Sequence, residues 1–236
     1  MQVVAKERAR AEAQAAAIMR ERLSSRAEQR GKAVLGLPGG RSVGGVLERF
    51  AETDASFSAV ELFFVDERCV PIEDEQSNFT VVRQSLIEPL IAAKSAIPEE
   101  HIHPFHCNTG EDDFGVGAYA REFRHVAEGL DVAVLGVGED GHIASLFPEA
   151  PVLDSPTGSQ AEPFLAIPDA PKPPAQRMSA SPSLLQHART TILLFFGDGK
   201  RAALKNFVSK DGSVSQCPAR LIRDNEDLWV FTDIGA

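Results

Sequence analysis

Residues 131–148, DVAVLGVGEDGHIASLFP, join a predicted buried strand to a run of glycines and ionisable side chains. Residues 132–135 form the short apolar run expected of a strand that is covered on both faces. Three glycines then allow a tight turn, and Asp140 and His142 lie among them. Ligands of open α/β sheets bind outside the carboxyl ends of the strands, so this stretch predicts both a parallel sheet and a site at its edge.

The rest of the chain repeats the alternation of strands and helices that is typical of such a sheet. Further strands are predicted at residues 33–37, 62–65, 164–167, 191–196 and 228–232, and helices at 3–30, 42–50, 77–90, 112–128 and 201–208. No internal repeat or low-complexity linker divides the chain. We therefore expect one α/β domain over residues 1–236, with an open, mostly parallel sheet and helices on both faces.

Composition and charge argue against several classes of function. The formal net charge is −10, whereas nucleic-acid binders neutralise phosphates with an excess of Lys and Arg. No apolar run approaches the roughly 20 residues that span a bilayer, and the charged, Ala-rich start lacks the apolar core of a secretory signal. We expect a cytoplasmic protein that binds neither nucleic acid nor membranes, with Cys69, Cys107 and Cys217 as reduced thiols.

Two glycine turns that follow predicted strands are suited to an anion. Residues 33–40 end in LPGG before a helix that Ser42 is expected to cap, and free N–H groups at such a turn favour negative charge. Residues 191–200 end in a second glycine turn that carries Lys200. The first turn is not a Walker A loop, because no Gly-Lys-Ser/Thr follows it. On this pattern alone, an ordinary connection from strand to helix explains the first turn equally well.

Three other polar patterns favour structural roles. Basic residues in the predicted helix 3–30 alternate with Glu, which indicates a solvated face rather than a membrane surface. Residues 66–68, Asp-Glu-Arg, are in isolation typical of a surface ion-pair cluster. His101, His103, His106 and Cys107 do not have the spacing of a common zinc module, so we expect a strand or loop with exposed histidines and no metal.

Four segments taken together resemble the 6-phosphogluconolactonase family. They are LPGGRSV (37–43), FFVDERCVPIEDEQSNF (63–79), LGVGEDGHIASLFP (135–148) and RMSASPSLLQHARTTILLFFGDGKRAAL (177–204), and the resemblance extends from about Lys32 to the closing LWVFTD. The resemblance implies a fold similar to that of the glucosamine-6-phosphate deaminases and ribose-5-phosphate isomerases. It also implies hydrolysis of 6-phospho-D-glucono-1,5-lactone to 6-phospho-D-gluconate in the oxidative pentose phosphate pathway.

The glucosamine-6-phosphate deaminases are the alternative, because they share the Gly-x-Gly-x-Asp-Gly-His core. Here His142 is followed by Ile-Ala-Ser-Leu-Phe-Pro, which is similar to the lactonase form, whereas the deaminase pattern continues Phe-Asn-Glu-Pro. Likewise residues 66–68 read Asp-Glu-Arg, where the deaminase pattern has Asp-Glu-Tyr. A dinucleotide fingerprint at residues 136–141 is formally present, but Asp140 would face the pyrophosphate and the following loop lacks the required helix–strand–acid continuation.

The resemblance implies that His142 is the general base that activates water. A histidine titrates near neutral pH, so it can take a proton from water and return it to the leaving ring oxygen. Asp140 or Asp66 is expected to orient the imidazole, and the sequence does not choose between them. Ser145 lacks the Gly-x-Ser-x-Gly surroundings of a nucleophile and is expected to cap a helix instead. This chemistry requires neither a cofactor nor a metal.

The resemblance also supplies the residues expected to bind a phosphorylated sugar lactone. Those for the phosphate are Gly39, Gly40, Ser42, Arg68 and Lys200, and Asn78 and Arg177 are secondary contacts to sugar or phosphate. The sequence departs from the family pattern at two places. Pro38 and Arg41 flank the first glycine turn where Ser-Gly-Gly-Ser-Thr is common, and residues 179–181 read Ser-Ala-Ser instead of Thr-Leu-Thr. Ser42 and backbone N–H groups are therefore the expected donors at this turn, in a protein expected to be a monomer.

Overall fold

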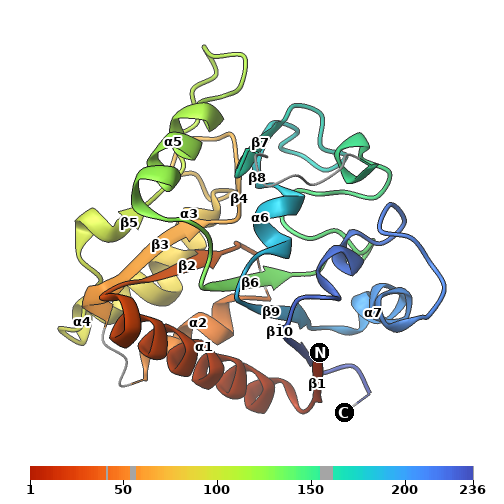
Figure 1. Ribbon diagram of the computed structural model, residues 1–236, viewed down its shortest axis with the longest axis horizontal. Coiled ribbons are helices and arrows are strands. Elements are labelled where there is room, and N and C mark those ends of the chain that lie inside the picture. Colours follow the sequence, from red (N-terminus) through yellow and green to blue (C-terminus); the bar gives the residue numbers. More distant parts are fainter. Residues whose placement is uncertain (41, 54–56, 155–161, 236) are drawn as a thin grey trace.

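A seven-stranded parallel sheet forms the centre of the computed structural model, which describes residues 1–40, 42–53, 57–154 and 162–235 (Figure 1). Its order is β1 (Gln2–Ala5), β10 (Asp227–Thr232), β9 (Thr190–Phe195), β6 (Val132–Gly136), β2 (Ala33–Leu37), β3 (Val60–Phe64) and β5 (Ile102–His103). Every neighbouring pair of these strands is parallel. The predicted fold class is therefore confirmed.

Helices cover both sides of the sheet, as expected from apolar strands that must be buried on two faces. Figure 1 shows α1 (Arg8–Arg30) and α2 (Gly44–Ala51) below the strands, and α5 (Val116–Val126) and α6 (Pro182–Gln186) above them. The remaining helices are α3 (Asn78–Val82) and α4 (Glu88–Ala92), which a π-helical turn at Arg83–Ile87 joins, and α7 (Arg201–Val208). All five residues of β2 are buried between these layers.

A second, antiparallel sheet lies beside the main one and was only partly predicted. Its order is β4 (Asp66–Arg68), β8 (Arg177–Ala180) and β7 (Phe164–Ile167). In β4, Asp66 pairs with Ser179 and Arg68 pairs with Arg177. The charged residues 66–68 are thus not a surface ion-pair cluster, since Asp66 and Glu67 are buried. A strand made of three charged residues has no apolar pattern by which the sequence would reveal it.

Three predictions for helix starts were wrong. The helix expected from residue 112 begins at Val116. The first helix begins at Arg8 rather than residue 3, because Gln2–Ala5 form β1, which pairs in parallel with the C-terminal strand β10. Figure 1 accordingly places the two chain ends near each other. Ser42 does not cap α2: the residue before that helix is Val43, and the Ser42 hydroxyl instead accepts a hydrogen bond from Lys200 Nζ at 2.7 Å.

The prediction of three reduced thiols was also wrong. Cys69 and Cys107 form a disulfide with their Cα atoms 5.0 Å apart, and Cys217 is a free, buried thiol. The paired cysteines are 38 residues apart in sequence and follow β4 and β5, two strands of different sheets. Their proximity therefore depends on how the two sheets are placed, which spacing in the sequence does not express.

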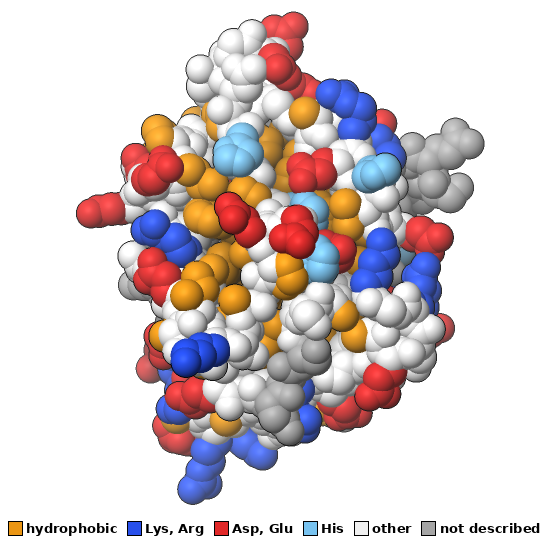
Figure 2. Space-filling model, turned by 90° about the vertical axis from the view of Figure 1, so that its left-hand side faces the viewer, with side chains coloured by type: hydrophobic (Ala, Val, Ile, Leu, Met, Phe, Trp, Pro, Cys, Tyr) orange, Lys and Arg blue, Asp and Glu red, His pale blue; other side chains and the backbone are white. Residues whose placement is uncertain are grey.

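Of the histidines near β5, His106 is exposed as predicted, whereas His103 is not. His103 is buried, its ring stacks on Phe63 at 4.1 Å, and its two nitrogens lie 2.7 Å from Glu122 and 3.0 Å from Glu61. Figure 2 shows histidines among acidic side chains on this side of the molecule. Within the described residues, no group of three or more His, Cys, Asp or Glu side chains is arranged to hold a metal ion. Likewise, none of the described helices is long and apolar enough to cross a membrane.

Asp131 ties the start of β6 to β2 and to α1. It is buried, and its carboxylate accepts the Val34 N–H at 2.9 Å and Arg26 Nε at 2.8 Å. Arg189 Nε also lies 3.5 Å from Asp131 Oδ1. Because the group bridges two central strands and a helix, its loss leaves a buried N–H and a half-buried guanidinium without their acceptor.

We therefore expect Asp131→Ala to lower the free energy of unfolding by about 2–4 kcal/mol. Glu128→Ala removes an ion pair with Arg30 in which the Glu128 side chain is 83% exposed, so it serves as the matched control and should leave stability unchanged. Urea unfolding followed by circular dichroism measures both variants. Equal midpoints for the two would contradict the bridging role of Asp131.

Candidate active site

A polar cavity of about 510 Å³ opens at the carboxyl ends of the central strands. After β2 the next strand of this sheet is β3, which lies towards one edge of the sheet. After β6 the next strand of this sheet is β9, which lies towards the opposite edge. The crevice between β2 and β6 is therefore a topological switch point, where open α/β sheets bind ligands. The predicted residues that line the cavity are Gly39, Gly40, Ser42, Asp66, Arg68, Asn78, His142, Arg177 and Lys200.

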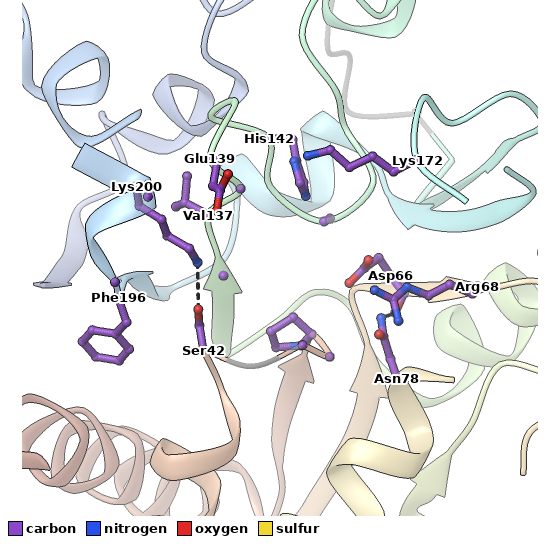
Figure 3. Close-up of a pocket in the computed structure, with 18 of the residues that line it drawn as sticks. Ser42, Asp66, Arg68, Asn78, Val137, Glu139, His142, Lys172, Phe196 and Lys200 are labelled. Carbon is purple, nitrogen blue, oxygen red and sulfur yellow. Dashed lines mark hydrogen bonds between the residues drawn. The ribbon is translucent and has the colours of Figure 1, made fainter. Parts of the chain in front are cut away.

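The loop after β6 is a tight turn that requires its glycines. The Gly138 N–H donates to the His142 carbonyl at 2.9 Å, and the Gly141 N–H donates to the Gly138 carbonyl at 3.0 Å. Gly141 has a φ of +86°, and a Cβ there would lie 2.8 Å from Cys217 Sγ. A side chain is therefore excluded both by the backbone conformation and by lack of space. The turn places His142 at the roof of the cavity, above Ser42 and Asn78 (Figure 3).

The carboxylate that contacts His142 is Asp140. Asp140 Oδ1 lies 2.5 Å from His142 Nδ1, and the His142 ring packs 4.7 Å from that of Phe147. Asp66 Oδ2 instead accepts a hydrogen bond from Ser145 Oγ at 3.3 Å. Ser145 does not start a helix as predicted, since no described helix includes it, and its N–H donates to Ser179 Oγ. Asp140 itself lies behind His142 rather than on the cavity wall.

Asp140 has a second partner, Lys172, which the sequence did not single out. Lys172 Nζ lies 2.7 Å from Asp140 Oδ2, so one carboxylate joins a lysine to an imidazole. Partial burial works to raise the pKa of Asp140, but the hydrogen bonds from His142 and Lys172 prevail and hold this pKa well below its usual range. Asp140 therefore stays ionised across the neutral range, which is what an orienting carboxylate requires.

Glu67 organises the wall opposite His142. The buried Glu67 carboxylate accepts the N–H groups of Arg68, Asn78 and Phe79 at 2.7–2.8 Å, together with the Ser77 hydroxyl at 3.0 Å. Burial raises the pKa of Glu67, and the three backbone N–H groups oppose that rise. The carboxylate thereby fixes the turn from β4 into α3, which presents Arg68 and Asn78 to the cavity.

Two groups on that wall offer unused hydrogen-bonding capacity. Asn78 Nδ2 donates to the Asp66 carbonyl at 2.8 Å, while its Oδ1 is buried without a partner among the described residues. Arg68 Nη1 donates to the Gln76 carbonyl at 2.6 Å, and its Nε is likewise unpaired within the described part of the chain. Buried polar atoms left unpaired in this way are unusual, and these two belong to residues that line the cavity.

On the far side of the cavity Lys200 and Ser42 meet. The dashed line in Figure 3 marks the hydrogen bond from Lys200 Nζ to Ser42 Oγ at 2.7 Å. It joins the turn after β9 to the turn after β2, which are the two glycine turns that the sequence indicated as suited to an anion. Arg41 lies outside the described residues. Gly40 has a φ of +87°, a backbone conformation that favours glycine.

Arg177 lines the cavity, but its guanidinium is hydrogen-bonded to the loop that contains Lys172 and Pro174. The buried Arg177 guanidinium donates through Nε to the Pro174 carbonyl and through Nη2 to the Lys172 carbonyl, each at 2.9 Å. Burial, followed by the nearby charge of Arg68, lowers the pKa of Arg177. These contacts support the loop that carries Lys172, a role that the sequence motif did not indicate.

The cavity is cationic although the whole protein is acidic. Its wall carries Arg8, Arg68, Lys172, Arg177 and Lys200 against only Asp66 and Glu139 as carboxylates. Arg8 belongs to the face of the first helix that the sequence predicted to be solvated. Its guanidinium pairs with Glu12 at 2.8 Å and lies 5.2 Å from the centre of the Phe196 ring. Neither Arg8 nor Lys172 lies in a glycine turn or at a strand end, so no local signal could have identified them.

Comparison with known proteins gives one consistent family. A family model described as glucosamine-6-phosphate isomerases/6-phosphogluconolactonase matches residues 6–230. The 6-phosphogluconolactonase of Borreliella burgdorferi is 35% identical over 200 residues, which cover 85% of this chain and 83% of that one. The 6-phosphogluconolactonase of Mycobacterium tuberculosis is 31% identical over 215 residues, which cover 86% and 83% of the two chains.

Solved structures share the fold over almost the whole chain. The 6-phosphogluconolactonase of Thermotoga maritima superimposes with a TM-score of 0.80 at 25% identity, covering 98% of both chains. That of Shewanella baltica superimposes with a TM-score of 0.83 at 24% identity, covering 98% of this chain and 96% of the other. The arrangement of the sheet and helices is therefore common to these proteins.

Close packing between Gly39 and Asn78 generates a test of the cavity wall. A Cβ on Gly39 would lie 1.9 Å from Asn78 Oδ1, whereas one on Gly44 would meet only Ser85 Oγ at 3.5 Å. We expect Gly39→Ala to lower the free energy of unfolding by about 1–3 kcal/mol, as overpacking does. Gly44→Ala, the control two residues past Ser42, should be neutral or stabilising by up to about 1 kcal/mol. Urea unfolding measures both, and an unaffected Gly39→Ala protein would contradict the contact with Asn78.

Proposed function

The chain belongs to the glucosamine-6-phosphate isomerase/6-phosphogluconolactonase family, and we propose that His142 is the general base with which it hydrolyses 6-phosphogluconolactone. The contact of Asp140 with His142 at the roof of a cationic cavity is the observation that carries this proposal. With Asp140 on Nδ1, the favoured tautomer keeps its hydrogen there and leaves the Nε2 lone pair for the substrate side.

The reaction has two steps that use the same histidine. Water attacks C1 of the lactone and gives a proton to His142 Nε2, while the carbonyl electron pair moves onto the carbonyl oxygen. When the carbonyl re-forms, the bond from C1 to the ring oxygen breaks, and the ring oxygen takes the proton from the imidazolium. Asp140 stabilises that imidazolium between the steps. The product carboxylic acid then ionises to 6-phosphogluconate.

Arg68 is suited to the oxyanion that forms between these steps. Its Nε is buried without a partner among the described residues, and its guanidinium is on the wall of the same cavity as His142. A preorganised cation stabilises the developing negative charge without reorganising during the reaction. Asn78 Oδ1, the other unpaired atom on that wall, is suited to accept a sugar hydroxyl.

Ser42, Lys200 and the backbone of the first glycine turn are proposed to hold the phosphate. Lys200 Nζ is already within 2.7 Å of Ser42 Oγ, so one anion there would meet an ammonium, a hydroxyl and N–H groups together. Residues 39, 40, 42 and 200 all line the cavity. The monomeric state and the cytoplasmic location expected from the sequence stay predictions.

We expect His142→Ala to reduce kcat by roughly 10²–10⁴-fold, the usual contribution of general acid–base catalysis. His125→Ala, on the exposed face of α5, is the matched control and should keep wild-type activity. The assay follows loss of 6-phosphogluconolactone with spontaneous hydrolysis subtracted, and circular dichroism checks that both proteins are folded. Wild-type activity in a folded His142→Ala protein would rule out His142 as the base.

Lys200→Ala should raise KM for 6-phosphogluconolactone by roughly 10- to 100-fold, because a charge-assisted contact to the phosphate is lost. The kcat/KM for unphosphorylated D-glucono-1,5-lactone should change less than about twofold, since that substrate makes no such contact. Lys205→Ala, an exposed lysine on α7, is the control for general charge effects. Equal losses with the two lactones would remove Lys200 from the phosphate site.

A further inference from the structure

Lys172 and His142 contact different oxygens of the same carboxylate, that of Asp140. Lys172 Nζ is 2.7 Å from Asp140 Oδ2, and the other carboxylate oxygen is 2.5 Å from His142 Nδ1. In Figure 3 the Lys172 amine lies beside the His142 ring. We propose that Lys172 is a positioning residue that acts through Asp140 to keep His142 oriented and unprotonated before water is activated. This inference rests on the proposed role of His142 as general base.

The loop that carries Lys172 is held in place by its own contacts. At its base the Ala170 N–H donates to the Ala175 carbonyl at 2.9 Å. Inside it the Arg177 guanidinium donates to the carbonyls of Lys172 and Pro174. Because Arg177 is buried in β8, these bonds join the loop to the small sheet. Lys172 is therefore anchored at its backbone as well as at its ammonium group.

Phe147 supplies a common surface for the same groups. Its buried ring lies 4.7 Å from the His142 ring, 5.9 Å from Lys172 Nζ and 5.5 Å from the Arg177 guanidinium carbon. A cation above an aromatic face is attracted by the ring quadrupole. The lysine and the histidine are thus held in fixed relation by Asp140 on one side and Phe147 on the other.

The charge of Lys172 affects the protonation of His142. An ionised carboxylate favours the charged form of a neighbouring imidazole. A cation on the second carboxylate oxygen offsets that attraction. The charged groups around His142 are Glu139 and Asp140 from its own loop, Lys172 from the loop after β7, Arg177 from β8, and Asp66 and Arg68 from β4. Of the cations, Lys172 is the one in contact with Asp140.

The alternative role for Lys172 is a direct contact with the substrate phosphate, since Lys172 also lines the cavity. The two roles differ in their kinetic consequences. A phosphate ligand contributes mainly to KM for the phosphorylated lactone at every pH. A residue that acts through Asp140 changes kcat and its pH dependence, and it does so for phosphorylated and unphosphorylated lactones alike.

The test compares Lys172→Met, which removes the charge but keeps a side chain of similar length, with Lys172→Arg, which keeps the charge. For Lys172→Met we expect the acidic limb of kcat to move to higher pH by about 0.5–1 unit, because the proton is held more tightly on His142. On the acidic side of that limb this corresponds to a roughly three- to tenfold loss of kcat, with recovery on its alkaline side. Lys172→Arg should restore the wild-type profile, and Lys210→Met, an exposed lysine away from the cavity, should not alter it.

Two further measurements separate this inference from the proposed function. Titration of His142 by NMR, with its resonance assigned from His142→Ala, reports the effect of Lys172→Met without any catalysis. If the histidine titration shifts but His142→Ala is fully active, the coupling of Lys172 to His142 stands and the assignment of His142 as base fails. In an Asp140→Asn background Lys172→Met should cause no further shift, because the charge acts through that carboxylate.

The inference is overturned by either of two outcomes. One is a raised KM for 6-phosphogluconolactone alone, with the pH profile and the His142 titration unchanged, which would make Lys172 a phosphate ligand. The other is an equal loss of kcat at every pH that Lys172→Arg does not rescue, which would indicate only a disturbed loop.

Discussion

The site depends on the parallel pairing of β2 with β6, in which Leu35 and Gly36 lie in register with Val132 and Ala133. Here the direction of the chain's winding reverses, so the segments that leave the two strands diverge and open a crevice between them. Gly36 leaves room for the neighbouring segments, because a Cβ there would lie 2.9 Å from Val65 Cγ1. Asp131 holds the same two strands together at their other end. Every residue proposed to act on substrate is placed relative to this pair.

Three carboxylates near the cavity have different roles because they differ in burial and in hydrogen-bond partners. Glu67 is buried and receives backbone N–H groups, so it shapes a turn. Asp66 receives a serine hydroxyl and faces the cavity. Asp140 receives a lysine and a histidine, and only it shares a charge network with the proposed base. The three carboxylates thus have different roles, because the partners of each group differ. One fixes a turn, one forms part of the cavity wall, and one contacts the proposed base.

Local charge rather than net charge decides what the cavity can bind. The chain carries a formal charge of −10, yet five cationic side chains line the cavity. Acidic side chains lie elsewhere on the surface, for example among the histidines in Figure 2. At an ionic strength near 0.15 M, charges more than about 8 Å from a bound phosphate are largely screened, so the nearby cations dominate. A strongly acidic protein is therefore compatible with an anionic substrate.

The sequence by itself determined the parallel sheet, because buried strands, glycine turns and helix caps are local patterns of apolar and turn-forming residues. Its glycine turns and strand ends also indicated Gly39, Gly40, Ser42, His142 and Lys200, whereas Asp66, Arg68, Asn78 and Arg177 were expected only from the family resemblance. Only the tertiary structure decided that Asp140 rather than Asp66 contacts His142, and that Cys69 meets Cys107. It also decided that Lys172 completes the charge network, because that lysine comes from a loop 30 residues beyond His142 which a buried arginine of the second sheet supports. Contacts between separate loops follow from packing in three dimensions, and no periodicity or spacing along the chain encodes them.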